Sequence, residues 1–529
     1  MPTRPFNRIA LSLSGGGYRA AAFHLGALSL LHKIHFNYPD EPASSLLERV
    51  TALSTISGGS ITGIRWAQDN AMGRPFEATF AKMYQILKED QLLKNALEKI
   101  NGLQPWQFAY KSKNLINAFA EVYDRDFFEG GTFGDLLNSR KGTIQEFIFN
   151  ATEFNNGLAF RFQNNGRFGN GELFLPQSAT SGLRLSDMAA ASSCFPGGFE
   201  PLMFPVDFAA VDTPIAQLWS EKYGNPVALM DGGIIDNQGI DAIEIANDRL
   251  VSKGGGIGTF IVSDVEGKSI TPYLPPGLGP QKRWSSWTLR GISNRAKWVF
   301  RGSLLFLLLC MILAYFKPGW WSWFLLPLLF VSGMISGAWL FVYKRIQNWF
   351  NQTVVKIVQD HQSDIVGNLE VLERTPVNVL INLAGIRATS LMTIANDVFM
   401  KRIRRIQYES LYTNKAWKDR VVGNFLYSLK DIKDSSLPDQ WKNILETANR
   451  MPTTLWFSPE HKSEKMLDQL IMAGQLTLCH LLIDHVEEWQ AKNNIPASTK
   501  KGLDQLYLVL VEQYEALKRD PGIILKNLI

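Results

Sequence analysis

Residues 54–60 decide the fold of this chain, and their sequence is Ser54-Thr55-Ile56-Ser57-Gly58-Gly59-Ser60. The apolar residues 50–53 predict a short buried strand before the turn, and residues 61–67 predict the start of a helix after it. A serine at such a junction is typical of a nucleophile elbow, whose hydroxyl is exposed beside a helix N-terminus that stabilises negative charge. The alternative is a plain chain reversal, because serine and glycine are common in loops.

A second strand-to-helix junction carries three consecutive glycines, Gly15, Gly16 and Gly17. Residues 9–13 predict the strand, and the small apolar residues 20–28 predict the helix. Consecutive glycines at a helix N-terminus form a nest of backbone N–H groups that can cradle an anion or an oxyanion. The stretch lacks the lysine of a phosphate-binding loop and the glycine spacing of a dinucleotide site.

A third junction ends in a carboxylate, Asp231, followed by Gly232 and Gly233. Aspartate followed by glycine is also a favoured turn pair, so the motif allows a purely structural interpretation. The functional interpretation is a carboxylate at the C-terminal end of a strand, where open α/β sheets place their sites. We therefore expect the three glycines, Ser57 and Asp231 at one edge of one sheet.

A fourth stretch, residues 185–201, predicts a short helix that Ser186 or Asp187 caps and that ends at Pro196-Gly197. With these four stretches in order, the chain resembles the patatin-like phospholipases of bacterial type. The resemblance covers roughly the first 265 residues and returns more weakly near the end. It implies an α/β protein with a three-layer α/β/α hydrolase core.

The resemblance also implies a role for each motif. Gly15, Gly16 and Gly17 would form the oxyanion hole, and Arg19 would be the anion- or substrate-binding arginine that follows it. Ser57 would be the nucleophile and Asp231 its base. Thr55 stands where the family usually has glycine, and its β-branched side chain leaves open how tightly the elbow closes.

The chemistry of the residues supports a Ser–Asp dyad independently of the family resemblance. Serine needs a base to take its proton, and histidine is the usual one. None of the seven histidines in this chain lies in a motif, so Asp231 is the simpler candidate. An aspartate has a reference pKa near 4, so burial must raise the pKa of Asp231 or the oxyanion hole must supply most of the catalysis.

Composition limits the other possibilities. With 54 Lys and Arg against 49 Asp and Glu, the net charge of +5 does not indicate nucleic-acid binding. The three cysteines provide neither a disulfide framework nor metal-ligand spacing. We expect no metal and no cofactor, and the cysteine usage fits a reducing compartment.

Residues 271–350 differ in character from what precedes them. A basic and aromatic segment leads into two apolar runs, about 302–316 and 324–343, with a tryptophan-rich loop between them. A bilayer-spanning helix needs about 20 apolar residues; the second run meets this length and the first is marginal. Tryptophans at the ends, with Lys344 and Arg345 after the second run, predict a transmembrane hairpin whose outer ends are cytoplasmic. A buried core hairpin or an oligomer contact is the alternative.

The remainder, residues 351–529, is predicted to be mainly helical. Residues 376–383 predict one more buried strand, and residues 467–482 resemble the closing helix of the family's domain. The hairpin would then be inserted within the catalytic domain. The expected division is a catalytic core at 1–270, the basic-aromatic segment and hairpin at 271–350, and the rest of the α/β domain with a helical C-terminal part at 351–529.

These observations together predict a membrane-anchored serine acyl hydrolase, of phospholipase A or lysophospholipase type, with its catalytic domain on the cytoplasmic side. Its partner would be the membrane phospholipid that it cleaves. One alternative is an esterase or an acyltransferase on the same dyad. Another is a non-catalytic membrane scaffold or sensor with an inert hydrolase fold.

Overall fold

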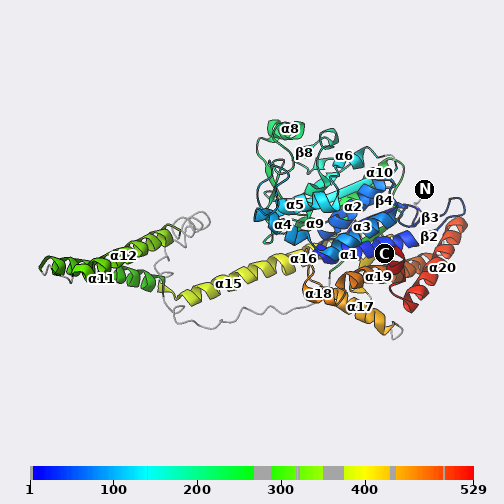
Figure 1. The fold of residues 1–529 in the computed structure, drawn as a ribbon. Helices are drawn as coiled ribbons and strands as arrows, with labels where there is room; N and C mark the ends of the chain where they lie inside the picture. Colours follow the sequence, from blue (N-terminus) through cyan, green and yellow to red (C-terminus); the bar gives the residue numbers. More distant parts are fainter. Residues whose placement is uncertain are drawn as a thin grey trace. The chain divides into compact units, whose positions relative to one another are not determined.

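A computed structural model describes residues 4–139, 141–266, 288–316, 319, 322–349, 374–428, 437–492 and 495–529. The chain divides into two compact units (Figure 1). The first, called the catalytic unit below, comprises Met1–Ile270 and Asn396–Ile529. The second, called the inserted unit, comprises Thr271–Ala395.

A ten-stranded mixed sheet forms the centre of the catalytic unit. Its parallel part has the order β12 (Val421–Phe425), β11 (Thr259–Asp264), β1 (Ile9–Leu13), β4 (Val50–Ile56), β5 (Glu146–Glu153). β6 (Leu158–Gln163) continues the sheet antiparallel to β5. The turn residues Asn155-Asn156-Gly157 between these two segments predict a hairpin, and the strand pairing confirms it. The short strands β7 (Phe168–Gly169), β8 (Phe174–Leu175) and β9 (Leu202–Phe204) complete it together with β10.

The direction of β10 (Val227–Asp231) differs from the simple expectation of an open parallel sheet. β5 continues past the end of β4, and β10 pairs antiparallel with this extension, with Asp231 opposite Ala151. The preceding residue of β5, Asn150, lies opposite Ile56 in β4. β10 is antiparallel to β5, and β4 is parallel to β5, so β10 and β4 run in opposite directions. Asp231, at the C-terminal end of β10, therefore approaches Ser57 from beyond the C-terminal end of β4.

Helices cover both faces of the sheet, which confirms the predicted three-layer α/β/α core. Alternate residues of β1 point to opposite faces: Leu11 and Leu13 belong to the larger apolar cluster, and Ala10 belongs to the smaller one. The larger cluster includes α1 (Gly17–Lys33) and α19 (Met466–Gln490). The smaller includes α10 (Ile240–Ser252) and part of α16 (Met400–Thr413).

The C-terminal part is helical, as predicted, and α19 closes the core against α1. The two helices approach closely because each has a glycine at the contact. A Cβ atom at Gly474 would lie 2.1 Å from the Phe23 carbonyl oxygen, and one at Gly26 would lie 2.0 Å from the Ile471 carbonyl oxygen. The other helices here are α17 (Asp439–Asn449), α18 (Pro459–Ser463), α20 (Ala497–Arg519) and α21 (Ile523–Leu528).

Two local predictions were wrong. Residues 376–383 do not form a strand but begin helix α15 (Val377–Thr393). The apolar pattern continues for 17 residues there, which is too long for a typical strand, and β12 is the strand that pairs with β11.

The second wrong prediction is the cap of α7 (Leu185–Ser192). Neither Ser186 nor Asp187 caps this helix: Arg184 is the N-cap residue, without a side-chain cap. Ser186 donates to Asp124, and Asp187 pairs with Lys111 at 2.6 Å. Both side chains are used by tertiary contacts with residues far away in the sequence.

The inserted unit contains two long helices that pack against each other, α11 (Leu289–Phe316) and α12 (Ser322–Trp349). The Ser332 hydroxyl donates to the Ser303 carbonyl oxygen at 3.1 Å, and the hydroxyls of Ser303 and Ser336 hydrogen-bond to each other. Large apolar side chains such as Leu305 and Phe330 are about 70% exposed. Much of this helix pair therefore presents apolar surface.

Two stretches among the described helices are long and apolar enough to cross a membrane. One is Trp323–Phe341 in α12, of which 11% is buried; the other is Met466–Gln490, of which 67% is buried. The second is the core helix α19. α11, which contains the first predicted apolar run, does not pass the same test.

Candidate active site

The elbow places Ser57 between β4 and α2 (Gly58–Met72), as the N-cap residue of that helix. Its backbone has φ 50° and ψ −123°, a conformation that L-residues rarely adopt and that is often found at functional sites. The glycines after it are required by close packing. A Cβ atom at Gly58 would lie 2.0 Å from the Gly17 carbonyl oxygen, and one at Gly59 would lie 2.3 Å from that of Leu13.

Thr55 fits the elbow because Gly63 lies beside it. A Cβ atom at Gly63 would lie 2.4 Å from the Thr55 methyl carbon, so the missing side chain makes room for the β-branched one. The Thr55 hydroxyl also hydrogen-bonds to Ser60 at 2.8 Å. Gly63, eight residues further along the chain in α2, thus accommodates the departure from the usual elbow glycine.

The glycine loop supplies fewer free amides than its sequence suggests. The Gly15 N–H donates to the Asn237 carbonyl oxygen at 3.1 Å, which removes it from the expected oxyanion hole. The N–H groups of Gly16 and Gly17 make no hydrogen bond to any residue that the structure describes. Both residues have positive φ, 146° and 59°. Only two of the three predicted donors are therefore available to a ligand.

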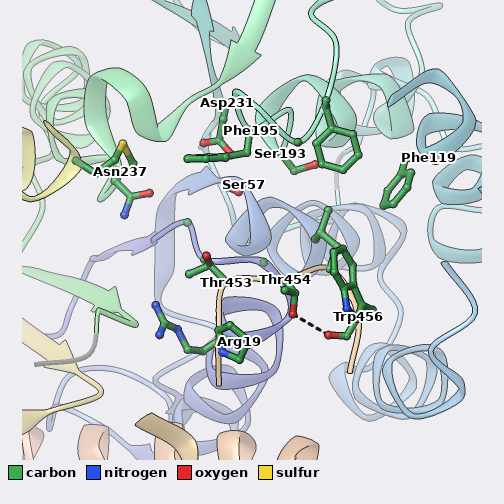
Figure 2. Close-up of a pocket in the computed structure, with 18 of the residues that line it drawn as sticks. Arg19, Ser57, Phe119, Ser193, Phe195, Asp231, Asn237, Thr453, Thr454 and Trp456 are labelled. Atoms are coloured by element: carbon green, nitrogen blue, oxygen red, sulfur yellow. Dashed lines mark hydrogen bonds between the residues drawn. The ribbon is translucent and has the colours of Figure 1, made fainter. Parts of the chain in front are cut away.

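Asp231 is 2% exposed and lies directly beside Ser57 (Figure 2). Burial raises the pKa of its carboxyl to about 6, against the opposing effects of the neighbouring Ser57 hydroxyl and of the hydrogen bond from the Gly233 N–H. The Gly233 N–H lies 2.7 Å from Oδ1. The carboxylate is thus oriented by its own turn and, unlike a solvated aspartate, has a pKa close to neutrality.

Ser192 of α7 was not identified as a supporting residue from the sequence. Its hydroxyl accepts from the Ser57 N–H at 2.9 Å and donates to the Asn150 carbonyl oxygen at 2.6 Å. It also hydrogen-bonds to Ser60 at 2.8 Å. Residues 185–201 were recognised as a motif, but the pairing of Ser192 with the elbow depends on the tertiary fold.

Histidine does not compete with Asp231 as the base. His24 is buried, with its ring nitrogens 3.0 Å from the Ser263 hydroxyl and the Ser14 carbonyl oxygen, and burial lowers its pKa to about 4. Neither it nor another histidine of the described ranges lines the cavity at Ser57. His361 lies outside those ranges.

A cavity of about 600 Å³ opens over Ser57, Asp231, Gly16 and Gly17, a volume typical of small-molecule sites. Phe119 and Trp456 lie to one side of Ser57, and Asn237 lies to the other (Figure 2). Most of the apolar lining comes from α4 (Leu92–Ile100), α5 (Leu115–Val122) and two loops, and it includes Leu93, Leu115, Phe119, Phe195, Phe199, Leu455 and Trp456. Helices α4 and α5, which lie in the chain between β4 and β5, thus provide part of the wall.

The polar lining beyond the catalytic groups includes the charged and amide side chains of Arg19, Asn237, Glu266, Lys401 and Arg404, together with Ser193, Thr453 and Thr454. Arg19 donates from Nη1 to the Met451 carbonyl oxygen at 3.0 Å, and burial lowers its pKa to about 10, so it remains charged at neutral pH. Lys401 and Arg404 lie in the first turns of α16. Their role was not predicted, because about 340 residues separate them from Ser57.

No group of three or more His, Cys, Asp or Glu side chains in the described part of the chain is arranged to hold a metal ion. The arrangement at Ser57 instead provides a hydroxyl, a carboxylate with a raised pKa and free backbone amides. These are the components of acyl transfer from an ester.

Comparison with known families agrees with this geometry. Residues 11–243 match the family model described as patatin-like phospholipase. The chain carries a patatin-like phospholipase domain. The match includes the glycine loop, Ser57 and Asp231, whereas α16 and residues 451–456 lie beyond it. The patatin-like domain supports a lipid acyl hydrolase in general.

The crystal structure of VipD from Legionella pneumophila aligns with 99% of this chain and 88% of that chain, with 12% identity and a TM-score of 0.25. That score is too low to support an argument about the patatin-like domain. No curated protein matches the chain.

Proposed function

We propose that this protein is a membrane-anchored serine acyl hydrolase that cleaves fatty-acyl esters of glycerophospholipids with a Ser57–Asp231 dyad. The observation that carries the proposal is that Ser57 and the buried Asp231 line one cavity, with the serine hydroxyl close enough to influence the pKa of the Asp231 carboxyl. The same cavity contains the N–H groups of Gly16 and Gly17, which make no hydrogen bond to any described residue.

In the proposed reaction, Asp231 takes the Ser57 proton as the serine oxygen attacks the ester carbonyl carbon. The developing oxyanion accepts hydrogen bonds from the Gly16 and Gly17 N–H groups, which are already oriented and cost no reorganisation. Collapse expels the glycerol oxygen, which takes the proton from Asp231 and leaves an acyl-serine. Water, deprotonated by Asp231, then attacks the acyl-serine, releasing the fatty acid and restoring the Ser57 hydroxyl.

The lining of the cavity supports a lipid substrate. Phe119, Phe199 and Trp456 are among the apolar residues beside Ser57, and aromatic side chains bury large apolar areas. A fatty-acyl chain could lie against them with its carbonyl carbon at Ser57. We propose this apolar side as the acyl-chain site.

We propose that α11 and α12 anchor the enzyme as a two-helix membrane hairpin. The support is the exposed apolar surface of the pair and the length of the apolar stretch in α12. Arg290 and Arg295 near the start of α11 and Lys344 and Arg345 near the end of α12 place basic residues at the outer ends. By the positive-inside rule these ends, and with them the catalytic unit, are cytoplasmic.

The proposal is tested by fatty-acid release from mixed phospholipid liposomes containing a chelator. Wild-type protein should release fatty acid, and the Ser57→Ala variant should release none above background. Release by both proteins would refute Ser57 as the nucleophile. If neither releases fatty acid and a fluorophosphonate probe fails to label Ser57, the proposed hydrolase is wrong.

A further inference from the structure

We propose that the side-chain hydroxyls of Thr55, Ser60 and Ser192, called the hydroxyl chain below, hold the backbone of Ser57 in the conformation that places its side chain beside Asp231. The three are positioning residues for the nucleophile, because all of them are 0% exposed and none lines the cavity that contains Ser57. The inference rests on the proposed function and adds the residues that keep its nucleophile in place.

The direction of each hydrogen bond in the hydroxyl chain follows from counting protons. The Ser192 hydroxyl donates its one proton to the Asn150 carbonyl oxygen at 2.6 Å, because a carbonyl can only accept. Ser192 therefore accepts from the Ser60 hydroxyl, which lies 2.8 Å away. Since Ser60 uses its own proton in that bond, it accepts from the Thr55 hydroxyl at 2.8 Å. The chain thus runs in one direction, from Thr55 to Asn150.

The hydroxyl chain contacts both backbone polar groups of the nucleophile. The Ser192 oxygen accepts a second hydrogen bond, from the Ser57 N–H at 2.9 Å. The Ser60 N–H donates to the Ser57 carbonyl oxygen at 2.8 Å. Ser57 has φ 50° and ψ −123°, and so rare a conformation persists only where the surrounding structure over-determines it. These two hydrogen bonds contribute that constraint.

The end of α7 also holds the turn that carries Asp231. The Asp231 N–H donates to the Cys194 carbonyl oxygen at 2.9 Å, and the Gly232 N–H donates to the Ser192 carbonyl oxygen at 3.3 Å. Ser192 thus contacts the nucleophile through its side chain and the turn of the base through its backbone. A shift of Ser192 would therefore change how Ser57 meets Asp231 (Figure 2), and small misplacements of reacting groups lower the rate.

Thr55 ties the two ends of the hydroxyl chain together. It begins the chain with its hydroxyl, and its carbonyl oxygen accepts from the side-chain amide of Asn150 at 3.1 Å. The hydrogen bonds therefore form a closed ring through β4, α2, α7 and β5. The glycine that usually stands at this place in the elbow has no hydroxyl, so the ring depends on the departure to threonine.

The test is Thr55→Val, which removes the hydroxyl and keeps a methyl group against Gly63. The full chain in nanodiscs is assayed with p-nitrophenyl butyrate, a soluble monomeric ester. We expect kcat to fall about fivefold, the equivalent of one hydrogen bond, with KM unchanged because Thr55 does not line the cavity. Thr55→Ser restores the hydroxyl and should restore kcat.

Thr62→Val is the matched control for the loss of a buried hydroxyl. Thr62 is 0% exposed on the same helix as Ser60, and its hydroxyl donates to the Ala21 carbonyl oxygen at 2.8 Å, outside the hydroxyl chain. We expect this variant to keep the wild-type kcat. An equal loss of kcat in Thr55→Val and Thr62→Val, or a failure of Thr55→Ser to restore it, would overturn the inference.

Hydrogen exchange provides a readout that does not depend on hydrolysis. In a peptide spanning residues 54–60, the Ser57 N–H should exchange faster in Thr55→Val than in wild type or Thr62→Val, because its acceptor Ser192 is held less firmly. Faster exchange supports the hydroxyl chain even if the protein cleaves no ester. Unchanged exchange refutes the chain whether or not hydrolysis occurs.

Discussion

α12 and α19 are both long and apolar enough to span a bilayer, yet their surroundings differ. The apolar stretch of α12 is 11% buried within the protein, and that of α19 is 67% buried. Gly474 in α19 lies directly against the backbone of α1, whereas Gly337 in α12 has no described atom within 4 Å of the position its Cβ would occupy. Length and hydropathy thus describe both helices equally well, and only the packing partners distinguish a core helix from a proposed membrane helix.

The first test of this comparison separates catalysis from membrane attachment. Ser57→Ala should lower fatty-acid release by at least about 10⁴-fold, because loss of a nucleophile removes the covalent route. The fraction of protein that sediments with membranes should stay at the wild-type value, since Ser57 lies in the catalytic unit. A variant that leaves the membrane fraction would show that the two functions are not separable.

Deletion of residues 302–343 is the converse test, because it removes the proposed membrane anchor and keeps Ser57 and Asp231. Without the apolar stretches of α11 and α12, the protein should move from the membrane pellet to the soluble fraction. Removal of an equally apolar segment from α19 should instead produce unfolded, protease-sensitive protein, because α19 closes the core. If the 302–343 deletion remains membrane-bound, the anchor lies elsewhere in the chain.

A matched pair of glycine-to-alanine substitutions compares the packing of α19 and α12 at a single position in each helix. Gly474→Ala should lower the free energy of unfolding by about 1–3 kcal/mol, because the added methyl group meets the Phe23 carbonyl oxygen at 2.1 Å. Gly337→Ala should change it by less than about 1 kcal/mol, and toward greater stability, since alanine favours helices. Thermal unfolding in detergent measures both, and equal effects would contradict the difference in packing.

The last prediction concerns pH. As the base, Asp231 must be ionised, so kcat/KM should fall below about pH 6, where its raised pKa lies. Folding raises this pKa from 3.8 to about 6. The buried carboxylate therefore costs stability above pH 6, and this cost disappears below about pH 4, where the group is protonated in both states.

Asp231→Asn tests the same shift through stability. At pH 8 the variant should be more stable than wild type by up to about 3 kcal/mol, the equivalent of the roughly two-unit shift. At pH 4 the advantage should vanish, while activity is lost at both pH values. A stability difference independent of pH would show that Asp231 does not have the raised pKa.

The sequence by itself determined the local junctions of the catalytic unit. The strand before Ser57, the helix after Gly17 and the β5–β6 hairpin follow from patterns that extend over ten residues or fewer. Such patterns are reliable because turn conformations and helix N-termini depend on neighbouring residues. The three-layer core was implied by the family resemblance, and the helical C-terminal part was predicted from the sequence of residues 351–529.

Only the tertiary structure decided how distant segments complete the site. It placed β10 antiparallel to the extension of β5, used the Gly15 N–H for Asn237, and brought Lys401 and Arg404 to the cavity. It also made residues 377–393 a helix, where a short apolar window predicted a strand. The reason is physical: strand direction, amide pairing and cavity walls depend on contacts between residues up to hundreds of positions apart, and no local pattern encodes those contacts.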